Sequence, residues 1–205
     1  MLITIEGIDG AGKTTLIKEL KDRLKDLNPV CSFEPGSPDL LVAVRNAISN
    51  NTDPIIEATL FIADHAICTS KLIKPALSEN RLVILDRYVD SRFAYQEVSL
   101  EGHISDPHKW LEDVHSGGWS IVPDKTFLLT LPIDVAMSRL DTRSEVEHFE
   151  RKEFLEKVQE KYLARVSEDP KRFVIIDATL PILEIIDFVE SSIRQLVTST
   201  PKSNN

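Results

Sequence analysis

The chain has 205 residues, of which 42% are hydrophobic and 28% are charged, a composition typical of a globular domain. Its formal net charge of −9 at pH 7 disfavours a nucleic-acid backbone or an anionic membrane as a partner. Its two cysteines stand apart in the sequence, no apolar run is long enough to span a bilayer, and the first residues include no basic region. For these three reasons we expect a cytoplasmic protein.

Short apolar runs alternate with longer segments of helical period along the chain. We expect the runs to be strands, at residues 2–5, 30–33, 82–85, 127–131 and 173–176. The helical segments are expected at residues 13–27, 40–49, 54–77, 107–114, 134–140, 150–166 and 183–197. This alternation predicts an α/β fold with a parallel sheet between layers of helices. We expect one domain over residues 1–197 and a disordered tail over residues 198–205, which has no apolar side chains to bury.

A glycine-rich segment follows the first apolar run and precedes the first helix. Its letters, GIDGAGKTT, match the phosphate-loop pattern G-x-x-x-x-G-K-[ST] in the strand-to-helix context that this pattern requires. In such a loop, backbone N–H groups and the helix N-terminus surround the β-phosphate, and the lysine reaches the β- and γ-phosphates. An ordinary glycine-rich turn is the alternative. The residues predicted to bind a nucleoside triphosphate are Gly7, Ile8, Asp9, Gly10, Ala11, Gly12, Lys13, Thr14 and Thr15.

The phosphate loop alone does not distinguish a GTPase, a motor ATPase and a small-molecule kinase. No Asn-Lys-x-Asp guanine motif is present; instead, the third apolar run leads into Asp86-Arg87-Tyr88, followed by Ser91, Ala94, Tyr95 and Gln96. This segment resembles the D-R-Y-x-x-S-x-x-A-Y-Q signature of the thymidylate kinase family of nucleoside monophosphate kinases. The letters FEPG at 33–36 resemble R-E-P-G of that family, and LFIADH at 60–65 resembles L-F-A-A-D-R. Residues 139–150 resemble its arginine-bearing lid, so the resemblance covers nearly the whole chain.

The resemblance implies a P-loop kinase fold with five parallel strands, a short lid at about 139–150 and a homodimer formed through the apolar helix at 55–77. It implies transfer of the ATP γ-phosphoryl group to dTMP, giving dTDP for dTTP synthesis, with Mg²⁺ as cofactor. The residues that it assigns to catalysis are Lys13, Arg87, Arg143 and Asp9. Arg139 is assigned to ATP, and Thr14 and Asp86 to the metal. The substrate-binding set is Asp9, Glu34, Pro35, Arg45, Phe61, His65, Arg87, Ser91, Tyr95 and Gln96.

The resemblance also implies individual roles within this set, and side-chain chemistry agrees with them. Arg143 is the first candidate for a lid arginine that stabilises the transition state, and Arg139 is the second. Asp9 is expected to face the acceptor sugar or to hold Arg87, with a solvated loop carboxylate as the alternative. Phe61 is expected to stack on the base, or else to be core, and the Gln96 amide is expected to favour thymine over cytosine.

Three positions depart from the family pattern, because Phe33, His65 and His148 stand where the family has arginine. We expect His65 to contact the acceptor phosphate, and a surface or packed histidine is the alternative. The departures keep two other functions open. One is a related kinase that acts on another nucleotide or on a deoxynucleoside, and the other is a P-loop binding protein without turnover.

Overall fold

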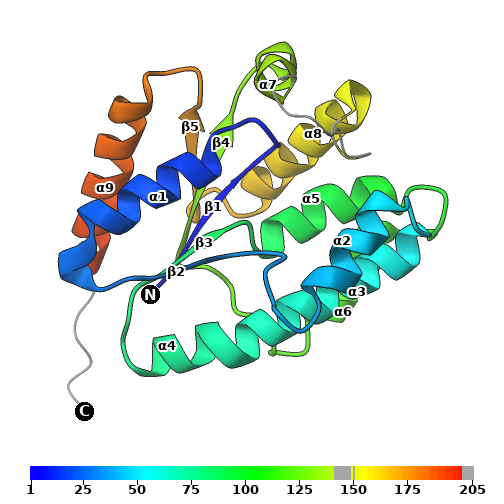
Figure 1. Ribbon diagram of the computed structural model, residues 1–205, viewed down its shortest axis with the longest axis horizontal. Helices are drawn as coiled ribbons and strands as arrows, with labels where there is room; N and C mark the ends of the chain where they lie inside the picture. The colour runs from blue at the N-terminus through cyan, green and yellow to red at the C-terminus, as the bar shows by residue number, and fades with distance from the viewer. Residues whose placement is uncertain (141–148, 150, 200–205) are drawn as a thin grey trace.

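The five predicted strands form one parallel sheet in the order β2-β3-β1-β4-β5, which confirms the predicted α/β fold (Figure 1). The strands are β1 (Leu2–Gly7), β2 (Val30–Phe33), β3 (Val83–Asp86), β4 (Lys125–Thr130) and β5 (Phe173–Asp177). The structure is a computed structural model, and it describes residues 1–140, 149 and 151–199. Every residue of β1 and β3 is buried, as expected for strands that have helices on both faces.

Helices cover both faces of the sheet. Figure 1 shows α1 (Lys13–Arg23) and α9 (Ile182–Ser199) on one side, and α5 (Val89–Ser99) and α8 (Lys152–Glu168) on the other. Each packs through residues of helical spacing, for example Ile185, Val189 and Ile193 on α9. The remaining helices are α2 (Leu41–Ser49), α3 (Pro54–Cys68), α4 (Lys74–Ser78), α6 (Pro107–His115) and α7 (Ile133–Leu140).

The carboxyl ends of three strands meet at one edge of the sheet. Ile5 of β1 and Phe33 of β2 both lie opposite Asp86, the last residue of β3. The segments that follow these strands are therefore neighbours, although they are far apart in the sequence. This edge is where ligands bind in open α/β sheets.

Helix α5 was not among the predicted helices. Its apolar period is obscured because ten of its residues are buried, including the polar Asp90, Ser91 and Arg92. Since α5 lies between the sheet and other helices, it has no solvent-exposed face to produce an amphipathic pattern.

Several predicted boundaries differ from the structure, and two of the differences change what a segment is. The helix expected at 54–77 divides into α3, a π-helical turn at Thr69–Ile73 and α4, where Pro75 lacks the N–H that a continuous α-helix needs. Helix α9 continues to Ser199, so Thr198 and Ser199 are helical rather than part of a tail. Within the described ranges, no helix is long and apolar enough to cross a membrane.

Candidate active site

The glycine-rich loop connects β1 to α1 at the carboxyl edge of the sheet. Gly10 has φ 82°, and a Cβ at this position would lie 2.7 Å from the carbonyl oxygen of Ala136. Gly12, the N-cap of α1, has φ 93°, in the left-handed region that favours glycine. The loop conformation therefore depends on these glycines, and it places the open N–H groups of α1 at the edge of the sheet.

The Lys13 side chain folds back over this loop. Only 6% of the residue is exposed, and Nζ donates to the carbonyl oxygen of Ile8 over 2.9 Å. Burial, together with the positive charge of Arg87, lowers the pKa of Lys13 to about 8. A polyanionic ligand would compensate this buried cation.

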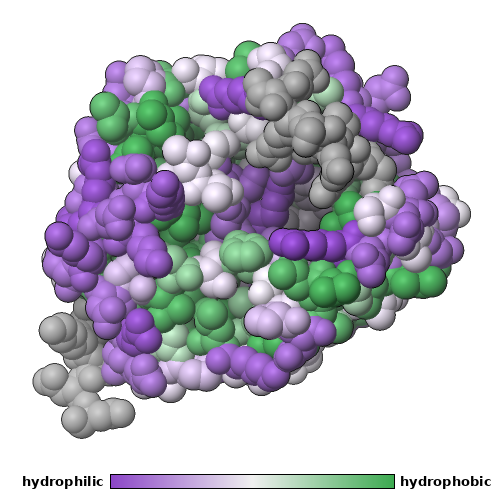
Figure 2. All heavy atoms as spheres, in the orientation of Figure 1, coloured by the Kyte–Doolittle hydropathy of each residue, from purple (hydrophilic) through white to green (hydrophobic). Residues whose placement is uncertain are grey.

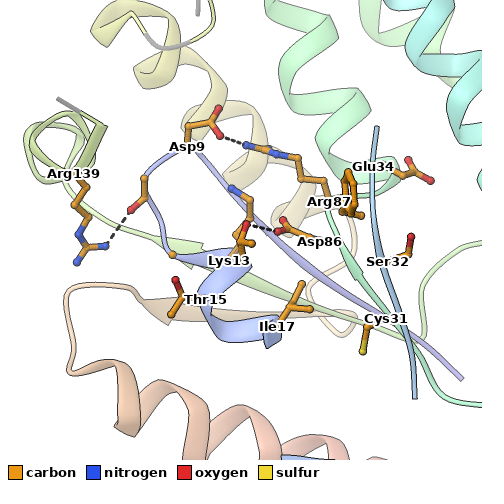
Figure 3. Close-up of a pocket in the computed structure, with 14 residues that line it drawn as sticks. Asp9, Lys13, Thr15, Ile17, Cys31, Ser32, Glu34, Asp86, Arg87 and Arg139 are labelled. Carbon is orange, nitrogen blue, oxygen red and sulfur yellow. Dashed lines mark hydrogen bonds and ion pairs between the residues drawn. The ribbon is translucent and has the colours of Figure 1, made fainter. Parts of the chain in front are cut away.

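A cavity of about 680 Å³ opens beside the loop, between β2, β3 and the start of α1. Figure 3 shows Lys13, Asp86, Arg87 and Arg139 around it. Figure 2 shows a hollow with hydrophilic residues at its base near the middle of the same face. We name this cavity the donor pocket because the phosphate loop forms one of its walls.

Thr14 and Asp86 lie together in the donor pocket. The Thr14 hydroxyl donates to Asp86 Oδ2 over 2.7 Å, and Asp86 is held at the end of β3. Oxygen ligands of this kind suit Mg²⁺. Among the described residues, no group of three or more His, Cys, Asp and Glu side chains could hold a metal ion. A magnesium ion here would therefore take further ligands from phosphate oxygens or water.

Asp9, Arg87 and Tyr95 form a hydrogen-bonded triangle. Arg87 Nη2 donates to Asp9 Oδ1 over 2.6 Å and to the Tyr95 hydroxyl over 3.1 Å, and that hydroxyl donates to Asp9 Oδ2 over 3.0 Å. Burial alone would raise the pKa of Asp9, but the positive charges of Arg87 and Lys13 lower it to about 2. Asp9 is thus a carboxylate that holds Arg87, as one of the two predicted roles requires.

Arg87 is also fixed by its backbone and by other partners. Its φ of 66° lies in the left-handed region, where a side chain other than glycine is strained. Nη1 donates to the carbonyl oxygen of Gly7 over 3.2 Å and to the Ser91 hydroxyl over 3.3 Å. The Ser91 hydroxyl itself donates to the buried carboxylate of Glu6 over 2.5 Å. Ser91 therefore contributes through Arg87 and Glu6.

A second, smaller cavity of about 100 Å³ lies on the α5 side of this triangle, and we name it the acceptor pocket. It shares Asp9 and Arg87 with the donor pocket. Pro35, Phe61, Ser91, Tyr95 and Gln96 also line it, so with Asp9 and Arg87 the structure brings seven members of the expected substrate set together.

Arg92 also lines the acceptor pocket, although it was not among the expected site residues. Its guanidinium lies 4.5 Å from the centre of the Phe61 ring. It precedes Gln96 by four residues, which places the two side chains on one face of a helix. Interpreting the segment after Tyr88 as a helix would have identified it.

For His65 the structure favours the alternative of a packed histidine over the predicted phosphate contact. The side chain is completely buried and lines neither the donor nor the acceptor pocket. Its Nδ1 lies 2.9 Å from Glu34 Oε2, and its Nε2 lies 2.8 Å from the Ser120 hydroxyl. Both ring nitrogens therefore have protein partners, and the histidine is a packed one.

Glu34 and Arg45 differ from the expected arrangement. Glu34 lines the donor pocket, but Figure 3 shows its carboxylate turned away from Lys13 and Asp86, and it bonds to His65 instead. Arg45 is exposed on α2 and lines neither pocket. Arg143 and His148, with most of the expected lid, lie outside the described residues.

Arg139, at the end of α7, connects two loops at the donor pocket. Nη1 donates to the carbonyl oxygen of Gly10 over 3.2 Å, and Nη2 donates to the carbonyl oxygen of Ala178 over 3.0 Å. The arginine thus joins the phosphate loop to the segment after β5.

The sequence was compared with known proteins. The thymidylate kinase family profile matches residues 5–189. A probable thymidylate kinase of Methanocorpusculum labreanum is 58% identical over 96% of this chain and 98% of its own length. One of Methanospirillum hungatei is 54% identical over 95% of this chain and 94% of its own, and one of Natronomonas pharaonis is 35% identical over 97% and 100%. The profile match and the similarity to these relatives show that the chain belongs to the thymidylate kinase family, and the two joined pockets agree with this.

Proposed function

We propose that the protein transfers the γ-phosphoryl group of ATP to dTMP and so produces ADP and dTDP for dTTP synthesis. The observation that carries this proposal is the junction of the two pockets at Asp9 and Arg87. A triphosphate on the phosphate loop and a monophosphate in the acceptor pocket would meet at this junction. Family membership supports the same reaction.

On the donor side, the phosphate loop and Lys13 would hold the β- and γ-phosphates. Thr14 and Asp86 would hold Mg²⁺ there, since their oxygens are already adjacent. When bound, the metal would neutralise charge on the phosphate oxygens. Arg139 would stabilise the ATP site through Gly10 and Ala178.

On the acceptor side, Arg87 would bind the phosphate of dTMP while Asp9 holds the guanidinium in place. A phosphate oxygen is already anionic at neutral pH, so the reaction needs positioning and positive charge rather than a general base. Phe61, Tyr95, Gln96 and Pro35 would surround the nucleoside. From the family resemblance, Arg143 is proposed to stabilise the transition state, and Arg45 and Glu34 to contribute to substrate binding.

We further propose one kinase domain that begins at residue 1 and includes α9 to its end at Ser199, with a lid at about 139–150, and that acts as a cytoplasmic homodimer. Helix α3 supports the dimer, because Ile55 is 40% exposed and Ile56 is 53% exposed. Ile73, near the end of the same apolar segment, is fully buried and does not contribute. Sedimentation of the purified protein tests the dimer.

The test of the reaction is product analysis with the purified protein, ATP and Mg²⁺. dTMP, dCMP, dGMP and thymidine are supplied separately, and we expect dTDP from dTMP as the main product. Phosphorylation of thymidine but not dTMP would contradict the proposal, and so would ATP binding without turnover on any acceptor.

Lys13→Ala tests whether the phosphate loop is needed for phosphoryl transfer. We expect no measurable phosphoryl transfer together with an unchanged circular dichroism spectrum, because Lys13 lies at the phosphate loop and supplies charge. Lys18→Ala is the control, since Lys18 is exposed on the same helix. Retained turnover in Lys13→Ala would exclude the phosphate-loop mechanism.

A further inference from the structure

Arg92 on α5 is a buried cation with unused hydrogen-bond donors. The residue is 3% exposed, and its Nε and Nη1 atoms have no hydrogen-bond partner among the described residues. Leaving such groups unpaired in the interior is costly. Because both donors belong to a side chain that lines the acceptor pocket, a bound ligand is the natural partner for them.

Gln96 presents a second unused group in the same pocket. The residue is 2% exposed, and its Oε1 atom likewise has no partner in the described part of the chain. Arg92 and Gln96 stand four residues apart on α5, so they lie on one helix face. Together they offer donors beside an acceptor, next to the aromatic ring of Phe61.

We propose that Arg92 is the residue that selects the base of the acceptor nucleotide. The guanidinium donates to a ring carbonyl oxygen while Gln96 Oε1 accepts from N3–H. Thymine and uracil present this carbonyl and N–H edge, whereas cytosine has an amino group in place of O4. This inference rests on the proposed function, because it names the group that chooses among monophosphates.

Arg92 discriminates more strictly than Gln96 can. A glutamine amide has one donor end and one acceptor end, so a rotation by half a turn would serve cytosine as well as thymine. A guanidinium has donors only and keeps its charge at all working pH values. In the proposed geometry, the amino group of cytosine would meet these donors and leave both sides unpaired.

The surroundings of Arg92 favour a neutral carbonyl over a phosphate. Phe61, Tyr95 and Phe149 line the pocket around it. Burial and the positive charge of Arg87 lower the pKa of Arg92, and the negative charges of Glu34, Glu6 and Asp64 oppose this shift although none of the three forms an ion pair with the guanidinium. Arg87, by contrast, lies where the two pockets join and is the cation available to a phosphate.

The experiment compares kcat/KM for dTMP, dUMP and dCMP in the wild type, Arg92→Met and Arg92→Gln. We expect the dTMP to dCMP ratio to fall at least about tenfold in both variants. The dTMP to dUMP ratio should stay the same, because these bases share the edge that Arg92 contacts. Arg165→Met is the control: Arg165 stacks on Phe93 at 4.2 Å, as Arg92 stacks on Phe61, but lines neither nucleotide pocket.

Thermal unfolding gives a readout that does not depend on turnover. Arg92→Met removes a buried charge without a direct partner, so we expect the Tm of the ligand-free protein to stay the same or rise. The Tm increase caused by dTMP should shrink, and that caused by dCMP should shrink less. A lower ligand-free Tm with an unchanged dTMP to dCMP ratio would overturn the proposal and make Arg92 a structural residue. Failure of the wild type to phosphorylate dTMP would instead contradict the proposed reaction, while these Tm shifts still decide the role of Arg92.

Discussion

Arg87 and Asp9 form a 2.6 Å ion pair at the boundary between the donor and acceptor pockets. The pair joins the segment after β3 to the segment after β1, and Arg87 keeps a left-handed backbone conformation with φ 66°. A carboxylate in a phosphate loop would repel a polyphosphate if it were free. Its pairing with Arg87 explains why the loop tolerates it.

Asp9→Asn should lower kcat for dTMP by about a hundredfold, because Arg87 loses its charged partner and its position at the phosphate. The KM for ATP should change far less, since Lys13 and the loop N–H groups remain. Tyr95→Phe is the graded comparison: it removes the hydroxyl that bonds to Asp9 and Arg87 but leaves their ion pair, so its kcat should fall by only about tenfold. Steady-state kinetics with both substrates measure this. Equal kcat in Asp9→Asn and the wild type would show that Arg87 does not need the carboxylate.

The sheet and the phosphate loop could be predicted because their signals are local. An apolar run of four to six residues followed by glycines and a lysine fixes a strand, a loop and a helix start with no reference to the rest of the chain. The parallel sheet followed from the alternation of strands and helices. The pairing of Asp9 with Arg87 joins segments about 80 residues apart and was expected only through the family resemblance, as one of two roles for Asp9, whereas the part of Tyr95 in it was not expected.

His65 and Arg92 show what a motif comparison leaves out. A histidine at the position of an arginine suggested a weaker phosphate ligand, but the His65 side chain bonds to Glu34 and Ser120. Ser120 lies in a loop far from His65 in the sequence. Arg92 carries no signal in the family signature, where its position is written x. Its importance depends on burial and on missing partners, which only a three-dimensional structure shows.

His65→Ala should lower the free energy of unfolding by about 2–3 kcal/mol, because it leaves the buried Glu34 carboxylate without this partner and opens a cavity. The KM for dTMP should vary with pH in parallel with the wild type between about pH 6 and 9, because the ring lines neither the donor nor the acceptor pocket. Urea denaturation and kinetics measure the two effects. His103→Ala, at an exposed position, is the control for stability. A change in the pH profile with unchanged stability would restore His65 to the substrate site.

Arg139→Ala and Arg143→Ala should separate ATP binding from transition-state stabilisation. Arg139 joins the phosphate loop to the segment after β5, so its loss should mainly raise the KM for ATP. A lid arginine would contact the phosphoryl group mainly in the transition state. Its loss should therefore lower kcat by about a thousandfold, with little effect on the KM for ATP. Initial rates at varied ATP with saturating dTMP distinguish these patterns. The reverse result would exchange the roles of the two arginines.

Glu6→Gln should make the stability of the protein less sensitive to pH. Glu6 is fully buried in β1 and accepts hydrogen bonds from the Tyr88 N–H, the Ser91 hydroxyl and the Tyr162 hydroxyl. Burial, reinforced by the negative charge of Asp90, raises the pKa of Glu6 from 4.5 to about 7. Between these values the folded protein binds a proton that the unfolded chain does not. This extra proton stabilises the folded protein. Its contribution to the free energy of unfolding is complete below pH 4.5 and is lost as the pH rises through 7.

The expected loss from this one group is about 3 kcal/mol between pH 4.5 and 8. Glutamine stays neutral at every pH and keeps a similar size, so Glu6→Gln should lack this loss even if it is less stable throughout. Urea denaturation at pH 5, 6, 7 and 8 gives the unfolding free energies of the wild type and the variant. The value for the variant minus the value for the wild type should increase as the pH rises. Glu19→Gln, an exposed change on α1, should run parallel to the wild type. Parallel curves for Glu6→Gln as well would mean that Glu6 is ionised in the folded protein throughout this range, with its charge satisfied by the three donors that surround it.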